Sequence, residues 1–266
     1  MSCREPSAWA ASWKDTKVSP GTAGLQASMA TRAAGAPAGP RARGSALVVV
    51  LMAVMLLSAL ALALAVLTTI ETLAAANHRG ATVALYAAEA GIERVLPDLA
   101  SFSNWDDALS GVVASTFVDG PPSGGRSLPD GRTVDPSGVA SLAGCGLRTP
   151  CSAAALDAVT ADRPWGRNNP RWQPFGYGTP ALAVPRRDVY VVVLVGDDPS
   201  ENDDDPLRDG RPPDNPGAGI LVVRAEAFGP AGSHRIVEAV VSRAPERLPG
   251  PPGLTSLRLI SWREVR

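Results

Sequence analysis

Residues 45–70 form a run of 26 residues without a single charged side chain, SALVVVLMAVMLLSALALALAVLTTI. As an α-helix, with a rise of about 1.5 Å per residue, this run is long enough to cross a hydrocarbon layer about 30 Å thick. A cleaved secretory signal is the first alternative, but its apolar region covers only about 7 to 15 residues before a small-residue cleavage site. The alanines at 74–76 could supply such a site, yet the apolar run is too long and Glu71 intervenes. We therefore predict a membrane-spanning helix.

The flank of this run predicts its orientation. Arg32, Arg41 and Arg43 precede the apolar residues, and positive residues close to a span remain on the cytoplasmic side. We expect a cytoplasmic N terminus at the bacterial inner membrane and a periplasmic C-terminal domain.

Residues 1–44 are a leader of unusual length. Its first part contains Glu5 and Asp15, whereas a start at Met29 gives a leader of 16 residues with three arginines and no acidic residue. We expect Met29 to be the true start. A disordered extension is the alternative.

The helix is predicted to continue well beyond the apolar run. No proline occurs between 45 and 96, although the chain has 25 prolines, and Pro97 is placed where a helix would stop. The second half of this segment is rich in alanine with spaced larger apolar residues, which is typical of a helix with one exposed and one packed side. We predict one helix over residues 45–97.

Three features together carry a family resemblance: a basic leader that ends in Gly44, an apolar helix that follows at once, and the run AAEAGIE at 87–93. The segment 41–96 resembles the N terminus of type IV prepilins, and most closely that of PilX-like minor pilins. The resemblance implies that a prepilin peptidase cuts between Gly44 and Ser45 and methylates the new N terminus. It also implies other pilins and pilus assembly proteins as partners, and it implies that the subunit could reach the extracellular space as part of a pilus.

Val49 departs from the pattern of the major pilins, which carry a glutamate five residues into the mature chain. That glutamate is thought to neutralise the N-terminal amine of a neighbouring subunit inside an apolar filament core, where an unpaired charge is costly. Its absence favours a tip or initiation role. Two alternatives remain open: a K-type pseudopilin of type II secretion, which also lacks the glutamate, and a plain single-span anchor for an extracytoplasmic binding module.

The C-terminal part, 188–266, has the pattern of an antiparallel sheet. Runs rich in β-branched residues cover 189–195, 220–228 and 236–242, a turn is expected at 229–233, and 257–265 could add an edge strand. Polar and apolar residues alternate around Arg224 and Glu226, which predicts one face packed on the helix and one face in water.

Residues 98–187 are rich in Gly, Pro, Ser and Asp, so we expect loops and short elements there, including one short helix or strand within 106–117. The predicted fold class is α+β and pilin-like: a long N-terminal helix, transmembrane in its first half, packs on a small antiparallel β-sheet.

The segment between the first two predicted strands is strongly acidic, with eight carboxylates against two arginines. Calcium accepts six to eight oxygen ligands in a flexible cage, so this loop could bind it, although the spacing is not that of an EF-hand. A solvated acidic loop and a series of Asx turns are the alternatives. The candidate ligands are Asp197, Asp198, Asn202, Asp203, Asp205 and Asp209.

Cys145 and Cys151 are the two cysteines outside the leader. In an oxidising compartment they could close the small loop GCGLRTPC through a disulfide. Together with the distant His78 and His234 they do not form a zinc pattern.

The remaining composition argues against two classes of function. A net charge of -1 offers no broad basic surface, so we expect no nucleic acid partner. The chain lacks GxSxG, P-loop and HExxH motifs and has only two histidines, so we expect no enzyme activity and no cofactor apart from calcium.

Overall fold

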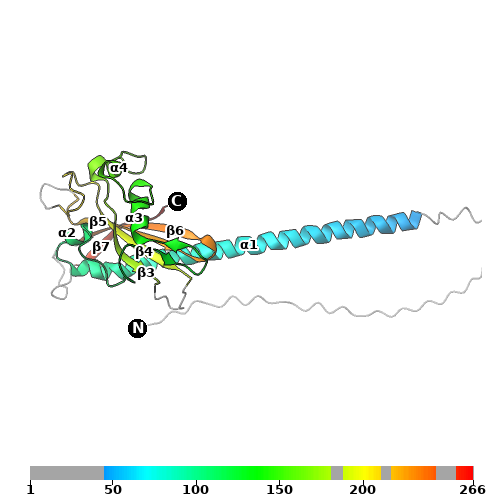
Figure 1. Cartoon of the computed structure of the whole chain (residues 1–266). Coiled ribbons are helices and arrows are strands. Elements are labelled where there is room, and N and C mark those ends of the chain that lie inside the picture. The colour runs from blue at the N-terminus through cyan, green and yellow to red at the C-terminus, as the bar shows by residue number, and fades with distance from the viewer. Residues whose placement is uncertain (1–44, 181–187, 211–216, 244–255, 266) are drawn as a thin grey trace, which may run out of the picture. The chain divides into compact units, whose positions relative to one another are not determined.

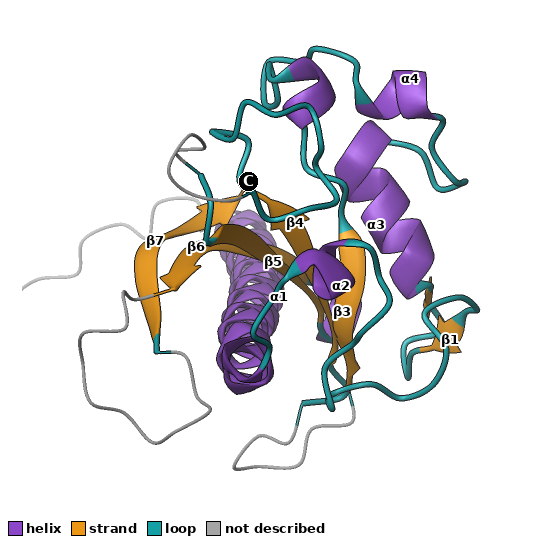
Figure 2. Ribbon diagram, turned by 90° about the vertical axis from the view of Figure 1, so that its left-hand side faces the viewer, coloured by secondary structure: helices purple, strands orange, loops and turns teal. Residues whose placement is uncertain are grey.

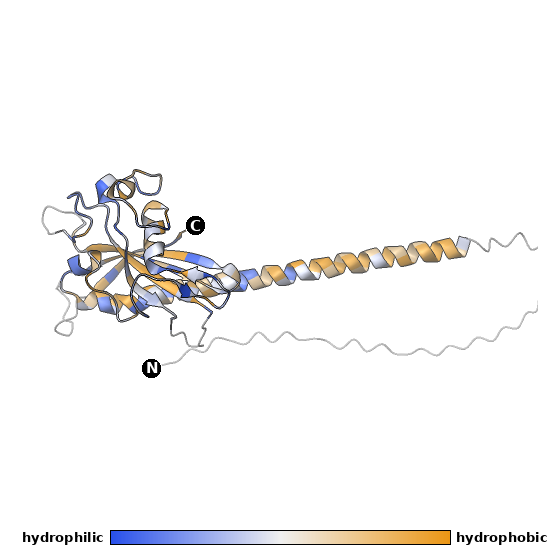
Figure 3. Ribbon diagram, viewed as in Figure 1, coloured by the Kyte–Doolittle hydropathy of each residue, from blue (hydrophilic) through white to orange (hydrophobic). Residues whose placement is uncertain are grey.

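The computed structural model describes residues 45–180, 188–210, 217–243 and 256–265 (Figure 1). It divides into two compact units, 1–58 and 59–266. A single helix, α1 (Ser45–Ser101), begins in the first unit and ends in the second. Its first half is almost continuously hydrophobic, as Figure 3 shows.

Few polar side chains interrupt this first half, and threonines among them bond to the helix backbone. The hydroxyl of Thr68 donates to the carbonyl of Leu64, and Thr69 and Thr72 bond in the same way to the carbonyls four residues earlier, each at 2.8 Å. Their hydrogen-bonding capacity is therefore met without water.

The helix extends beyond Pro97 to Ser101, so the predicted end is four residues too early. Proline removes one backbone donor and usually ends a helix. Here contacts of the residues that follow Pro97 hold the last turn in place. Leu99 is fully buried, and its carbonyl accepts a hydrogen bond from the indole Nε1 of Trp105 at 3.0 Å. The carboxylate of Asp98 accepts a hydrogen bond from the backbone N–H of Thr116 at 2.7 Å. These contacts outweigh the lost bond.

Five antiparallel strands form the sheet, in the order β3–β4–β5–β6–β7. Strands β5 and β7 have the predicted bounds, and β4 and β6 lie within two residues of them. Strand β3 was not predicted, because its sequence QPFGYG contains a proline and two glycines. The strands are β3 (Gln173–Gly178), β4 (Tyr190–Asp197), β5 (Ile220–Phe228), β6 (His234–Arg243) and β7 (Leu257–Val265).

The second half of α1 packs on one face of this sheet through small residues. Ala84, Ala87, Ala88 and Gly91 are buried, and they face valines and alanines of β4, β5 and β6. Small side chains let the helix backbone approach the sheet closely. At Gly91 an added Cβ would lie 2.6 Å from a methyl carbon of Val191, so only glycine fits there.

The other face of the sheet was predicted to lie in water, and this prediction is wrong for part of that face. A covering layer from residues 120–172 lies over it (Figure 2). Tyr190, Val192 and Leu194 of β4 point into this layer and are buried. The covering layer contains β1 (Arg126–Ser127), β2 (Thr133–Val134), α3 (Pro136–Cys145), α4 (Ala153–Leu156) and the 3-10 helix η1 (Gly166–Asn168). Its composition predicts loops, so only folding reveals that it forms a second core.

Short local signals set the ends of α3. The Asp135 carboxylate accepts a hydrogen bond from the N–H of Ser137 at 3.2 Å, Pro136 opens the first turn, and Gly146 ends the helix in the left-handed region. A disulfide joins Cys145, the last residue of α3, to Cys151. The remaining helices are α2 (Asp106–Leu109), inside the predicted range 106–117, and η2 (Pro230–Gly232) in the predicted turn.

We expect Gly91→Ala to lower the free energy of unfolding by about 1–3 kcal/mol, because the new methyl group overpacks the helix–sheet contact. This loss exceeds the gain of about 1 kcal/mol that alanine brings to a helix interior. Urea denaturation followed by circular dichroism measures the change. The matched control is Gly138→Ala in α3, where an added Cβ has only ordinary contacts at 3.5 Å or more and should not destabilise the protein. Equal stability of Gly91→Ala and the wild type would contradict this account of the packing.

Candidate functional site

The predicted cleavage junction coincides with the start of α1. Ser45 is the first residue of the helix, while Gly44 lies outside the described residues. The bond between them therefore directly precedes the apolar helix.

The first half of α1 presents an apolar surface on all sides. From Leu47 to Leu73 the large apolar side chains are between 51% and 72% exposed. Of the described helices, only α1 is long and apolar enough to span a membrane. A surface of this size is not stable in water and requires lipid or other apolar helices around it.

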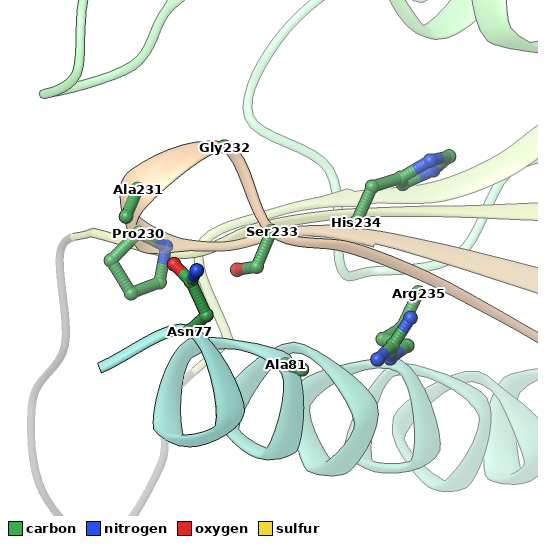
Figure 4. Close-up of a pocket in the computed structure, with 8 residues that line it drawn as sticks. All are labelled: Asn77, Ala81, Pro230, Ala231, Gly232, Ser233, His234 and Arg235. Carbon is green, nitrogen blue, oxygen red and sulfur yellow. The ribbon is translucent and has the colours of Figure 1, made fainter. Parts of the chain in front are cut away.

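This exposed surface ends where the turn between β5 and β6 contacts the helix. Gly80 is the first buried residue of α1, and the β5–β6 turn lies against it, with the carbonyl of Pro230 3.3 Å from the position of an added Cβ. Figure 4 shows the small pocket at this place, about 220 Å³, with Ser233 turned toward α1 near Asn77. Ala231 adopts a left-handed conformation, φ 53°, to make the turn. The pocket is too small for a sizeable ligand and marks the boundary between the exposed and packed parts of α1.

The acidic loop follows Asp197, the last residue of β4. Asp197 pairs with Leu221 near the start of β5, whereas Tyr190 pairs with Phe228 at the end of β5. The loop therefore lies at the end of the sheet opposite the β5–β6 turn. Asp197 is buried, as is Glu201, which was not among the candidate ligands. Asp209 accepts a hydrogen bond from the N–H of Gly219 at 2.6 Å.

Several candidate ligands of this loop are bonded to their own backbone. Asp198 accepts from the N–H of Ser200 at 3.0 Å, and Asp203 accepts from the N–H of Asp205 at 3.0 Å. These are the Asx turns expected as one alternative. Asn202 is exposed. Within the described part of the chain no group of three or more His, Cys, Asp or Glu residues is arranged to hold a metal ion. Calcium binding by this loop stays a prediction.

Burial, together with repulsion from the neighbouring carboxylate of Glu201, raises the pKa of Asp197 to about 9. Burial also raises the pKa of Asp209. With a pKa of about 9, Asp197 is protonated at neutral pH unless a cation balances its charge.

A chain of ion pairs crosses the face of the sheet that lies away from α1. His234 Nε2 lies 3.0 Å from Glu226, and Arg224 bonds to both Glu226 at 2.8 Å and Glu238 at 2.7 Å. Arg263 of β7 completes the chain at 2.6 Å from Glu238. Sequence alternation placed Arg224 and Glu226 on this face, but the partners on β6 and β7 become visible only when the strand register is known.

We expect Asp197→Asn to raise the free energy of unfolding at pH 8 by at least about 1 kcal/mol. The raised pKa means that the wild type must take up a proton to fold above pH 4, so its stability falls as the pH rises from about 4 to about 9. Asparagine needs no proton, and the advantage of the variant should vanish at pH 4. Urea denaturation at both pH values tests this, with Asp204→Asn, an exposed carboxylate of the same loop, as the matched control. An equal advantage at pH 4 and pH 8 would rule out a buried proton as the cause.

If the loop binds calcium, millimolar calcium should raise the melting temperature of the full chain, because a ligand that binds only the folded state stabilises it. The double variant Asp203→Asn/Asp205→Asn should lose this shift, whereas Asp162→Asn, outside the loop, should keep it. An unchanged melting temperature of the wild type in calcium would end the calcium hypothesis.

One of three comparisons with known proteins gives a match. Residues 43–93 match the family model described as PilX N-terminal. No curated protein and no solved structure matches the chain. The matched segment begins at the end of the leader and contains most of α1, including the apolar half and the small residues that pack on the sheet. The sheet and its covering layer lie outside the match. The match over 43–93, together with a long apolar helix that packs on an antiparallel sheet, supports a PilX-like type IV pilin.

Proposed function

We propose that this chain is a minor type IV pilin, a pilus assembly subunit that a prepilin peptidase cuts between Gly44 and Ser45. The mature subunit inserts through α1 into a pilus or a tip complex. The observation that carries this proposal is the division of α1 into an apolar half that contacts nothing in the described chain and a second half that is packed on the sheet from Gly80 onward.

This division fits a subunit that must exchange one apolar environment for another. Before assembly, lipid surrounds the first half of α1, and after assembly the apolar helices of neighbouring subunits replace the lipid. The transfer conserves the burial of apolar surface, so its free-energy cost is far smaller than that of passing through water. The energy for extraction would come from partner proteins of the assembly machine.

The proposed topology places the leader in the cytoplasm and the sheet in the periplasm. The arginines at 41 and 43 favour this orientation. The disulfide between Cys145 and Cys151 agrees with it, because disulfides persist in the periplasm and are rare in the cytoplasm.

Val49 supports a role as a minor rather than a major subunit. No acidic side chain occurs in the first 26 residues after Gly44, so this subunit cannot neutralise the N-terminal amine of a neighbour inside an apolar core. Such a subunit suits a position that few copies occupy, such as the tip.

We expect Gly44→Val to leave an uncut precursor in cells that also express a prepilin peptidase, because a branched side chain at the cleavage position blocks access to the bond. Intact-mass spectrometry of the membrane-extracted protein distinguishes the precursor from the mature chain that begins at Ser45. Gly35→Val, a glycine of the leader away from the junction, is the matched control and should be processed normally.

Two outcomes would contradict the proposal. Normal processing of Gly44→Val at Ser45 would show that the junction is wrong. Retention of the leader by the wild type in the presence of the peptidase would favour a plain membrane anchor for a binding module. Normal processing of the wild type leaves the K-type pseudopilin as the alternative, and co-purification with type II secretion or pilus assembly components separates the two machines.

A further inference from the structure

A cavity of about 680 Å³ lies on the side of the sheet away from α1, between the strands and the covering layer. Its floor is formed by Arg224 of β5, Glu238 of β6 and Arg263 of β7. Its walls include Trp165 and Pro199 from the neighbouring loops. The cavity takes no part in the proposed membrane insertion, which uses the apolar half of α1.

The charges on the floor of this cavity are paired with one another. Glu238 accepts hydrogen bonds from Arg224 at 2.7 Å and from Nε and Nη2 of Arg263 at 3.0 and 2.6 Å. Arg224 also holds Glu226 at 2.8 Å. The other charged residues of the lining are Arg163, Asp162 and Glu264. Glu264 pairs with Arg235, and within the described residues the buried Nε of Arg163 has no hydrogen-bond partner. The floor of the cavity is therefore charged, and its charges are paired with one another.

The paired charges of the floor select against ionic and apolar ligands. An anion or a cation would have to compete with partners that the side chains of the floor already have. An apolar ligand would remove water from charged groups without replacing its hydrogen bonds, which is costly. A neutral ligand with many hydroxyl groups avoids both problems, since each hydroxyl donates to a carboxylate oxygen and accepts from a guanidinium N–H.

Trp165 supplies an apolar surface at the same place. It is 49% exposed, although large aromatic side chains are usually buried. Trp172, by contrast, is buried in the wall with the guanidinium of Arg224 6.0 Å from its ring centre. The exposed indole can stack on the C–H face of a ligand ring, while the planar polar groups of the floor bond to hydroxyl groups at the edge of that ring.

We propose that this cavity binds a short neutral oligosaccharide. The indole of Trp165 stacks on a sugar ring, and Arg263 and Glu238 bond to its hydroxyl groups. The volume lies within the range of about 300–1,000 Å³ that small-molecule sites occupy. The inference is independent of the cleavage at Gly44, so either can fail without the other.

The test uses the full chain in a zwitterionic detergent that has no sugar headgroup. Maltotriose, cellotriose and the trimer of N-acetylglucosamine are titrated in turn, and saturation-transfer NMR follows their ring protons. At least one of the three should bind saturably at millimolar or lower concentration. Its affinity should be the same at 50 and 500 mM salt, because the ligand carries no charge.

Trp165→Ala should weaken this binding at least tenfold, and Trp165→Phe should retain part of it. The matched control is Trp262→Ala, which removes a similarly exposed indole, 45%, from the face of the sheet that α1 covers. That variant should bind as the wild type does, and thermal melting confirms that all three variants fold.

Three outcomes would overturn the proposal. The first is that none of the three sugars binds saturably. The second is that Trp165→Ala binds as tightly as the wild type, or that Trp262→Ala weakens binding equally. The third is salt-sensitive binding of hexaglutamate without binding of any sugar, which would assign the cavity to acidic peptides instead.

Discussion

The close contact between the second half of α1 and the sheet supports the rest of the architecture. Alanines and Gly91 bring the helix backbone against the valines of β4, and this contact anchors a helix whose first half has no partner in the described chain. If the helix were displaced from the sheet, the inner faces of β4, β5 and β6 would be exposed to water. The same contact therefore stabilises the domain and joins it rigidly to the second half of the helix.

The sheet has two covered faces of different chemistry. The face toward α1 is filled by alanine, valine and leucine, whereas the opposite face combines a second apolar core over β4 with ion pairs over β5 and β6. Charged residues at the edge of a partly covered face avoid the cost of full burial while they remain paired. Such a face holds water and polar ligands more readily than an apolar one, which is the physical basis of the inferred saccharide site.

The edge of the sheet at β7 has a feature that limits unwanted association. The register between β6 and β7 shifts between Val240 and Val241, so a bulge interrupts the edge strand. Bulges and charged side chains such as Arg263 make an edge strand a poor template for pairing with another chain. This agrees with the proposed function, in which the subunit assembles through its helix rather than through its sheet.

Sequence alone determined the features that depend on local pattern. The charge-free run, the resemblance at the start of α1 and the three strands rich in β-branched residues could all be predicted, because hydropathy and periodicity are properties of neighbouring residues. The bounds of β5 and β7 follow from the same signals. Of the candidate functional features, the junction at Gly44 and the acidic loop were visible in this way.

The tertiary structure decided what depends on residues far apart in the chain. The end of α1 beyond Pro97 depends on contacts with Trp105 and Thr116, and β3 forms only because β4 offers a partner for a segment of weak strand propensity. The second core and the cavity lined by Trp165 join segments from both halves of the domain, and the chain of ion pairs joins three neighbouring strands. No local pattern encodes such contacts, because their free energy appears only when the segments meet.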